Sequence, residues 1–350
     1  INVYRSYLKD DTQLMAVIKA EAYGSGSAQL AGYLENKNID YLSVAIIDED
    51  ISIRESNCKM PIMVFNVQQD QLEKLWDYQL EPEIYSLELL DMMIEHAEKK
   101  RAPLSVHLMI DTGMHRLGFS IEDLNDVCTK LKAKKWLKVK SLMSHLASSE
   151  NEEHDAFTKS QIQIFEESCH KIETTLNYAP MRHICNTAGI IRFNQHQMQM
   201  VRLGLGLYGI DETGLIADKL QKVHSLKARI LQIKTLQAGE STGYGLSGKV
   251  DKTTTIATVS IGYADGILRA CGNGNYKMRI GKNHYPTIGN ICMDLCMLDI
   301  TGADNLQAGD TVVIFDEDTP IESLAQACNT ISYEIISRIS PRVKRSYTYR

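Results

Sequence analysis

The first two hundred residues alternate short apolar runs with amphipathic stretches, and this alternation restricts the folds open to the chain. Eight runs have the length and branching of buried strands, the fourth and seventh being the weakest. They are Leu14–Ile18, Tyr41–Ile46, Ile62–Phe65, Glu81–Tyr85, Leu104–Ile110, Leu137–Met143, Met181–Cys185 and Met200–Leu203. Stretches with helical spacing lie between them, for example Leu87–Lys99, Ile121–Lys134 and Asp155–Thr175. This pattern predicts a (β/α)8 barrel of the TIM type rather than an open doubly wound sheet.

After Gly209 the pattern changes to Val- and Thr-rich runs that turn sequences such as Gly272-Asn273-Gly274 separate. The expected strands are Ser225–Leu236, Thr253–Ile261, Tyr276–Ile280, Met293–Ile300 and Thr311–Phe315, followed by one helix at Ile321–Thr330. We therefore predict two domains, the barrel over residues 1–220 and a mostly β domain over residues 221–350. The chain begins in what reads as the middle of a helix, so amino-terminal residues are expected to be missing.

Composition narrows the class of protein. The 350 residues carry a net charge of −6 and no strongly basic block, which argues against nucleic acid as a partner. The eight cysteines lack framework spacing, as expected for reduced thiols in the cytoplasm. Cys292 and Cys296 have no further Cys or His nearby to complete a zinc site, so we expect no metal. No run approaches the roughly 18–20 apolar residues of a membrane span, so no membrane contact by these residues is expected.

Polar residues follow several predicted strands, and in a barrel such positions share one rim, where barrel enzymes place their chemistry. Lys19 and Tyr23 follow the first strand, Arg116 the fifth and His145 the sixth. A lysine desolvated at a strand end has a pKa below its usual value of about 10.4 and becomes a nucleophilic amine. Each residue also has a simpler interpretation: a strand-capping lysine, a surface ion pair or a core histidine. Their convergence favours a site.

The loops after the seventh and eighth predicted strands favour a phosphate site. They read Asn186-Thr187-Ala188-Gly189 and Arg202-Leu203-Gly204-Leu205-Gly206. Hydroxyls and backbone N–H groups at a helix start suit a phosphate dianion, although Thr187 would equally well cap a helix. A lysine amine and a phosphate cradle at one barrel mouth imply pyridoxal 5′-phosphate held as a Schiff base.

Eight ordered motifs give the whole chain a resemblance to the alanine racemases, the fold-type III pyridoxal-phosphate enzymes. They are Ala16–Gly24, Asp111–Gly118, Ser144-His145, His183–Thr187, Arg202–Gly209, Gly243–Gly245, Ile261–Gly266 and Gly289–Asp294. The resemblance implies a homodimer with shared active sites that supplies D-amino acids for peptidoglycan precursors. Lys19 would hold the cofactor and act as one base. Tyr244 from the second subunit would be the opposite base, because racemisation needs proton transfer on both faces of Cα.

The resemblance also implies the contacts of the cofactor and substrate. Arg202 would bond the pyridine nitrogen, where an always-charged group cannot donate the ring its proton and so disfavours transamination. The other cofactor-binding residues would be Tyr23, Asn186, Thr187, Gly204 and Leu205, with His145 behind Arg202. Arg116 would contact both the phenolic oxygen and the substrate. Tyr263, Met293 and Asp294 would line the entrance and meet the substrate carboxylate.

The chain departs from the family pattern at several positions. Met109 stands where most relatives have a carbamylated lysine that orients the arginine, so Arg116 must be held otherwise, for example by a bound anion. Glu21 and Ser25 replace a usual asparagine and histidine. Pro341 stands where many relatives have a tyrosine that narrows the pocket, so activity on both alanine and serine is expected. This resembles the racemase domains of vancomycin-resistance membrane proteins, which would make the chain the cytoplasmic part of an anchored protein.

Two other functions stay open from the sequence. A pyridoxal-phosphate decarboxylase of basic amino acids shares the barrel, but such enzymes place an acid, not an arginine such as Arg202, at the pyridine nitrogen. A non-catalytic cofactor-binding or sensory domain would explain Met109. The presence of both expected bases, Lys19 and Tyr244, argues against it.

Overall fold

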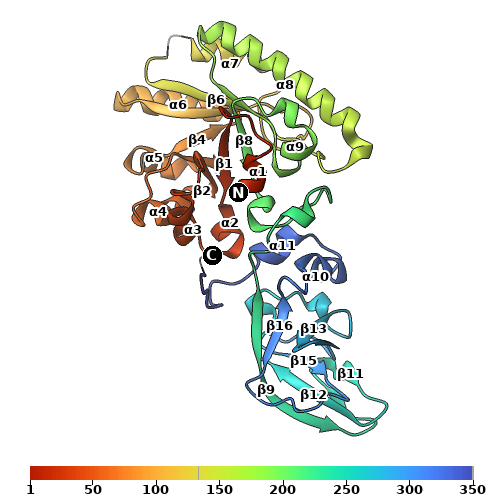
Figure 1. Cartoon of the computed structure of the whole chain (residues 1–350). Coiled ribbons are helices and arrows are strands. Elements are labelled where there is room, and N and C mark those ends of the chain that lie inside the picture. Colours follow the sequence, from red (N-terminus) through yellow and green to blue (C-terminus); the bar gives the residue numbers. More distant parts are fainter. Residues whose placement is uncertain (133, 349–350) are drawn as a thin grey trace. The chain divides into compact units, whose positions relative to one another are not determined.

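The computed structural model describes residues 1–132 and 134–348 and divides the chain into two compact units (Figure 1). The first unit comprises residues 1–22 and 26–220, and the second comprises residues 23–25 and 221–350. Residue 133, within the predicted helix Ile121–Lys134, lies outside the described residues, as do residues 349 and 350 of the predicted second domain.

The first unit is built on eight parallel strands, as predicted. They are β1 (Gln13–Val17), β2 (Tyr41–Ile46), β3 (Ile62–Asn66), β4 (Glu81–Ile84), β5 (Leu104–Met109), β6 (Leu137–Met143), β7 (Met181–His183) and β8 (Met200–Leu203), in the order β7-β6-β5-β4-β3-β2-β1-β8. Backbone hydrogen bonds from Arg202 N–H to the Cys185 carbonyl (3.0 Å) and from Gln199 N–H to the Arg182 carbonyl (3.2 Å) join the last two strands. The eight strands therefore form a nearly closed barrel.

Helices follow most of the strands and enclose the barrel (Figure 1). They are α3 (Ser27–Leu34), α4 (Ile47–Glu55), α5 (Leu72–Asp77), α6 (Leu87–Lys100), α7 (Leu124–Leu131), α8 (Asp155–Leu176) and α9 (Thr187–Arg192), with the short α1 (Asn2–Arg5) at the chain start. The prediction for α7 is too long at both ends. Lys132 takes an extended ψ of 124°, so α7 ends at Leu131, about one turn before the predicted end at Lys134.

Alternate strand residues pack in opposite directions, as the period of two in a strand requires. Leu14, Ala16, Leu42 and similar residues belong to the large core beneath the helices. The intervening residues form a separate interior cluster of Met15, Tyr41, Met63, Met109, Met143 and Met200. Because methionine is unbranched and flexible, it fills the irregular inside of a small barrel well.

The second unit is mostly β, as predicted. Its six-stranded sheet has the order β14-β13-β16-β9-β12-β15 and antiparallel pairing throughout. The strands are β9 (Leu226–Leu236), β12 (Thr254–Val259), β13 (Lys277–Ile280), β14 (Asn283–Pro286), β15 (Cys296–Asp299) and β16 (Thr311–Phe315), and a small pair joins β10 (Ser241–Thr242) to β11 (Gly248–Lys249).

The expectation of a single late helix is wrong, because α10 (Ile321–Ala327) is followed by α11 (Ser332–Ser337). The second helix has only six residues, and it buries Ile335 and Ile336. The edge strand β14 also went unpredicted. Two of its four residues are exposed and none is buried, so it lacks the alternation of apolar and polar residues that marks a strand in sequence.

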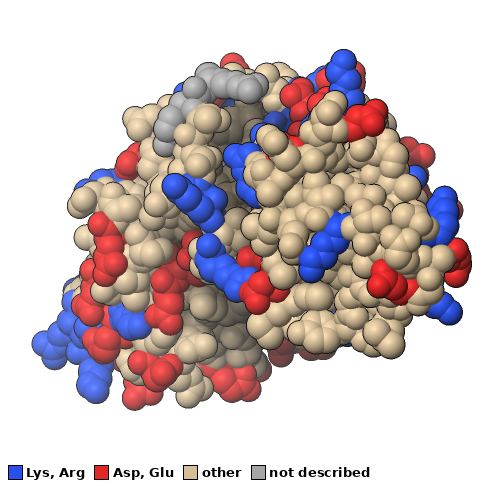
Figure 2. Space-filling model, turned by 90° about the horizontal axis from the view of Figure 1, so that it is seen from below, with Lys and Arg blue, Asp and Glu red and all other residues tan. Residues whose placement is uncertain are grey.

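Charge is mixed over the surface. Acidic and basic side chains are interspersed on the face drawn in Figure 2. Within residues 1–132 and 134–348, no helix is long and apolar enough to cross a membrane. In the same part of the chain, no three His, Cys, Asp or Glu side chains are grouped to hold a metal ion.

Candidate active site

The barrel brings the predicted residues of the first unit to one rim, at the carboxyl ends of its strands. Lys19 follows β1, Arg116 follows β5, His145 follows β6, Asn186 and Thr187 follow β7, Arg202 lies in β8, and Gly204 and Leu205 follow it. The remaining predicted residues belong to the second unit: Tyr23, Tyr244, Tyr263, Met293 and Asp294.

The chain leaves β1 through a left-handed helical turn. This turn is α2 (Lys19–Gly24), in which Ala20 to Tyr23 have φ between 51° and 54° and Gly24 has φ 74°. Left-handed helix costs an L-residue roughly 1–2 kcal/mol, so four consecutive non-glycine residues in this conformation are strongly strained. Strain of this kind concentrates at functional sites, and here it begins directly after Lys19.

Glu49 on α4 stabilises this turn, a role that the sequence analysis missed. Its carboxylate accepts hydrogen bonds from Ala20 N–H at 2.6 Å and Ala45 N–H at 2.8 Å. The backbone adds a bond from Ala22 N–H to the Ile18 carbonyl at 2.9 Å. A glutamate at the start of a helix shows no sequence signal for this contact, because the contact joins the turn after β1 to the end of β2, which are adjacent only in the folded barrel.

The environment of Lys19 favours its neutral amine. Burial lowers its pKa, the positive charge of Arg116 lowers it further, and Glu49 and Glu83 oppose the shift. The ammonium nitrogen lies 5.8 Å from the centroid of the Phe65 ring. The sequence-based expectation of a lysine with lowered pKa at the end of the first strand is therefore met, and such an amine can act as a nucleophile.

Arg202 is a buried cation with a fixed orientation. Its guanidinium donates to the carbonyls of Ser144 (2.6 Å), His183 (3.1 Å) and Ile184 (3.2 Å) and to His183 Nδ1 (2.7 Å). Burial lowers its pKa to about 10, although the field of Glu83 opposes this, so the group stays charged at neutral pH. Five donors on a rigid plane allow this many simultaneous contacts.

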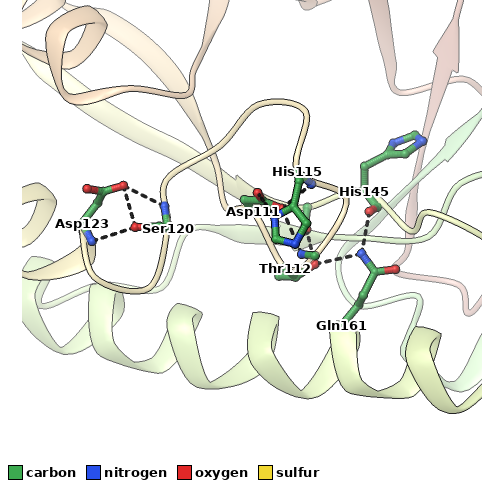
Figure 3. A network of polar contacts seen from close by, with 9 residues as sticks. Asp111, Thr112, His115, Ser120, Asp123, His145 and Gln161 are labelled. Atoms are coloured by element: carbon green, nitrogen blue, oxygen red, sulfur yellow. Dashed lines mark hydrogen bonds and ion pairs between the residues drawn. The ribbon is translucent and has the colours of Figure 1, made fainter.

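His145 is neutral at this rim. Burial lowers its pKa to about 3, and the charges of Arg202, Arg116 and Lys19 act in the same direction. Its Nδ1 lies 3.4 Å from Arg202 Nη2. Gln161 on α8 holds the backbone beneath, donating to the His145 carbonyl at 3.1 Å, and the His145 ring points away from this contact (Figure 3).

The loop that carries Arg116 is organised around Asp111. The Asp111 carboxylate accepts from Gly113 N–H (2.9 Å), His115 N–H (3.0 Å) and His115 Nδ1 (3.1 Å) (Figure 3). Burial alone would raise the pKa of Asp111, but these hydrogen bonds outweigh it and the pKa is lowered. Thr112 ties the same loop to the one after β6 through a 2.8 Å contact between Thr112 Oγ1 and Ser144 Oγ.

The loops after β7 and β8 are joined to each other. Asn186, rather than Thr187, caps α9, since Asn186 Oδ1 accepts from Gly189 N–H at 3.0 Å. Thr187 Oγ1 accepts from Gly204 N–H at 2.9 Å. The hydroxyl and the backbone amide expected to bind phosphate therefore lie side by side and bond each other.

Glu83 is the charged rim group that the sequence analysis missed. It lies on β4, is 4% exposed, and is coupled electrostatically to Arg202, Arg116 and Lys19. Burial raises its pKa to about 8 against the pull of these three cations. The signal was the alternation Glu81-Pro82-Glu83, which places two acidic side chains on one strand face. Met109, in contrast, lies in the apolar methionine cluster and is 3% exposed.

We expect Glu83→Gln to remove a pH dependence of folding stability. The pKa of Glu83 is about 8 in the folded protein, against 4.5 for a glutamate exposed to water in the unfolded chain. Glu83 therefore holds its proton more tightly in the folded state. The free energy of unfolding of the wild type therefore falls as the pH rises from 4.5 to about 8. At pH above 8, where the wild-type carboxyl is ionised, the variant should be more stable by up to about 5 kcal/mol. Urea unfolding of the protein without added cofactor, across this pH range, measures the difference.

The matched control is Glu95→Gln, which neutralises an exposed glutamate on α6. Asp50, whose pKa burial raises to about 9, contributes the same slope to every variant and cancels in the comparison. Parallel stability curves for the wild type and Glu83→Gln would show that Glu83 is not buried in its charged form at high pH.

Of the candidate residues of the second unit, Tyr23 is buried, whereas Tyr244, Tyr263, Met293 and Asp294 are exposed. Tyr244 is 74% exposed in a turn between Gly243 and Gly245, which take positive φ values of 76° and 70°. Tyr263 and Met293 are 41% and 53% exposed. Exposed aromatic and apolar side chains of this kind are typical of a surface that meets a partner.

Asp294 is held by the segment after α11. Arg342 donates to Asp294 at 2.8 Å through Nη2 and to Asp265 at 2.8 Å through Nε. Pro341, directly before this arginine, is exposed. The carboxylate of Asp294 is therefore already paired with a cation.

Comparison with known proteins covers both units. Residues 1–212 match the family model "Alanine racemase, N-terminal domain" and residues 223–347 match "Alanine racemase, C-terminal domain". Alanine racemase 1 of Caldanaerobacter subterraneus subsp. tengcongensis is 33% identical, over 97% of this chain and 89% of that protein. The alanine racemase of Clostridium kluyveri is 34% identical, over 96% and 88% respectively.

Solved structures agree with these matches. The alanine racemase from D-cycloserine-producing Streptomyces lavendulae superimposes with a TM-score of 0.93 at 27% identity, covering 99% of this chain and 93% of that one. The alanine racemase from Bartonella henselae with covalently bound pyridoxal phosphate gives 0.91 at 27% identity, covering 99% and 95%.

Proposed function

Because this chain belongs to the alanine racemase family, we propose that it is a pyridoxal 5′-phosphate-dependent isomerase that interconverts L- and D-alanine and also L- and D-serine. The observation that carries this proposal is Lys19: an amine of lowered pKa after β1, held by a strained turn and surrounded by the charges of Arg116 and Glu83.

The donor set at the barrel rim fits the cofactor. Lys19 offers an amine of lowered pKa, Arg202 a buried donor for a ring nitrogen, and Thr187 with Gly204 a hydroxyl and an amide for phosphate. When bound, pyridoxal 5′-phosphate supplies an aldehyde that links to an amine and a ring that delocalises charge from Cα. To hold the phosphate, Gly204 N–H would give up its bond to Thr187, and Asn186 would act by capping the adjacent α9.

Arg202 and His145 set the electrostatics at the ring. Arg202 stays charged and is bonded to three backbone carbonyls, so it would donate a hydrogen bond to the pyridine nitrogen without transferring a proton. His145, neutral because its pKa is about 3, adds no second positive charge. This arrangement favours return of the α proton over transamination, and it supports a racemase over a decarboxylase with an acid at that position.

Two bases on opposite faces of Cα are needed for racemisation. Lys19 is one of them, and we assign the other to Tyr244 supplied by a second copy of this chain. Tyr244 is 74% exposed, and Tyr263 and Met293 are exposed as well. Their exposure supports a role on a surface that another subunit covers. Arg116 on the loop after β5 would orient the substrate and the phenolic oxygen.

Pro341 is the reason to include serine. A proline there lacks the ring and hydroxyl that a tyrosine would place at that point of the chain. A pocket favours serine over alanine only when something bonds the extra hydroxyl, so comparable rates on both substrates are expected rather than a strong preference for serine.

The test is racemisation of L-alanine and L-serine by the purified protein with added pyridoxal phosphate, resolved by chiral chromatography. We expect kcat/KM for the two substrates to agree within about tenfold, and Pro341→Tyr to shift the ratio toward alanine by about tenfold or more. A large preference of the wild type for alanine would disprove the serine part. Release of CO2 from ornithine, lysine or arginine would favour the decarboxylase, and a bound cofactor with no product would favour a binding domain.

A further inference from the structure

A continuous row of polar side chains crosses the inside of the barrel beneath the rim. Methionines from neighbouring strands, among them Met15, Met63 and Met143, pack in the same interior. The row consists of Tyr41 on β2, Glu81 on β4, His107 on β5, Ser141 on β6, His183 on β7 and Arg202 on β8. Its last member is the arginine that the proposed function places at the pyridine nitrogen.

Successive members are joined by short hydrogen bonds. His183 Nδ1 lies 2.7 Å from Arg202 Nη1, and His183 Nε2 lies 2.7 Å from Ser141 Oγ. Ser141 Oγ lies 2.6 Å from His107 Nδ1, and His107 Nε2 lies 3.0 Å from Glu81 Oε2. Tyr41 donates its hydroxyl to the same Glu81 oxygen. Four contacts therefore connect the buried guanidinium of Arg202 with the carboxylate of Glu81, and Tyr41 adds a fifth at the carboxylate end.

The direction of every proton in this row follows from its two ends. Arginine has donors only, so His183 Nδ1 carries no hydrogen and His183 Nε2 donates to Ser141. Ser141 has one hydroxyl hydrogen, which it gives to His107 Nδ1. His107 Nε2 then donates to Glu81, which as a carboxylate only accepts. One set of neutral tautomers therefore satisfies all the contacts.

Burial makes this arrangement rigid. Ser141, His107 and His183 are fully buried and Arg202 is 2% exposed. In such surroundings an unpaired donor or acceptor is costly, so the row changes its protonation pattern only as a unit. The pKa of His183 is lowered far below its usual value by burial and by Arg202, and hydrogen bonds from His107 and Tyr41 outweigh burial to lower the pKa of Glu81. The lowered pKa of His183 agrees with a neutral His183 ring, and the lowered pKa of Glu81 agrees with a charged carboxylate at the other end of the row.

We propose that Glu81, His107 and Ser141 are positioning residues for Arg202: they fix the tautomer of His183 and, through it, the orientation of the guanidinium that meets the cofactor ring. This inference rests on the proposed function only for what Arg202 binds. We call the chain of hydrogen bonds from Glu81 to Arg202 the relay. It acts at a distance, since Glu81 reaches Arg202 through three intervening side chains.

The test compares Ser141→Ala, which removes the middle of the relay, with Ser43→Ala. Ser43 is also a fully buried serine on the interior face of a barrel strand, but among the described residues its hydroxyl has no hydrogen-bond partner. The first measurement is ¹⁵N NMR of histidine side chains in the protein without cofactor. In the wild type and in Ser43→Ala we expect both histidines to carry their hydrogen on Nε2, and His183, whose pKa is lowered, to stay neutral near neutral pH. In Ser141→Ala the signals of both histidines should be altered.

The second measurement uses the cofactor. We expect Ser141→Ala to weaken pyridoxal phosphate binding by about tenfold and to raise the ratio of pyruvate formed to alanine racemised, while Ser43→Ala changes neither. Glu81→Gln, which keeps the side-chain shape and removes the distal charge, should give the same changes in weaker form if Ser141→Ala does not fold. A merely structural role would lower thermal stability without moving the tautomers or the transamination ratio.

The two proposals fail separately. Unchanged histidine signals in Ser141→Ala and Glu81→Gln overturn the relay, whatever the enzyme does. A wild type with the expected tautomers but no racemisation overturns the proposed function and leaves the relay in place. Normal tautomers in the wild type combined with an unchanged transamination ratio in both variants would show that Arg202 is positioned by its backbone contacts alone.

Discussion

Lys19→Ala is expected to abolish racemisation and to leave a folded protein that no longer holds pyridoxal phosphate covalently. The amine at this position is the only rim group that links to an aldehyde in the proposed mechanism, and it is also one of the two bases. Loss of both roles should reduce kcat/KM for L-alanine by on the order of 10³-fold or more. The absorbance band of the lysine-bound cofactor, which borohydride reduction would make permanent in the wild type, should be absent from the variant.

The fold should survive this substitution. Burial and Arg116 both lower the pKa of Lys19, so its charged form is unfavourable where it stands and its removal relieves a cost rather than adding one. Thermal unfolding of the protein without cofactor is therefore expected to be unchanged or slightly improved. Lys59→Ala, at an exposed lysine before β3, is the control that should keep full activity. An unchanged absorbance band in Lys19→Ala would contradict the assignment of this residue.

The barrel was predictable because its strands are buried on both faces. The run Tyr41–Ile46 is apolar except for Ser43, Leu137–Met143 ends in three buried residues, and the bounds of both agree with β2 and β6 without change. A strand that lacks such burial gives no comparable signal, and β14 (Asn283–Pro286) was missed for that reason. The rim positions followed from the strands, since a barrel gathers the residues after its strands regardless of their separation in sequence.

The internal chemistry of the site was less predictable. The left-handed turn after Lys19 contains Ala20, Glu21, Ala22 and Tyr23, none of which favours positive φ, so no local propensity indicates it. Tertiary contacts such as those of Glu49 override the local preference. The polar row from Glu81 to Arg202 was invisible for a different reason: its contacts depend on which strands are neighbours and on which face of each strand is interior.

Tyr244→Phe is expected to stop racemisation in both directions while the lysine-bound cofactor keeps its absorbance. Loss of one base removes proton transfer on one face of Cα only. One enantiomer of alanine should therefore still exchange its α proton with deuterated solvent without inverting, and the other should not. The overall rates from L- and D-alanine fall together, because the two enantiomers have equal free energy. NMR of alanine in D2O measures the exchange and chiral chromatography measures the inversion.

Mixed dimers determine which copy of the chain supplies this tyrosine. Co-expression of Lys19→Ala and Tyr244→Phe with two different tags allows the heterodimer to be purified away from both inactive homodimers. If Tyr244 acts on the site of the other subunit, one of the two sites contains both bases, and the heterodimer should have about half the activity of the wild type. If Tyr244 acts within its own chain, each site lacks one base and the heterodimer is inactive. Half activity would also explain why Tyr244, Tyr263 and Met293 are exposed on a single chain. An inactive heterodimer would mean that the exposed turn around Tyr244 serves another purpose and that the second base lies elsewhere.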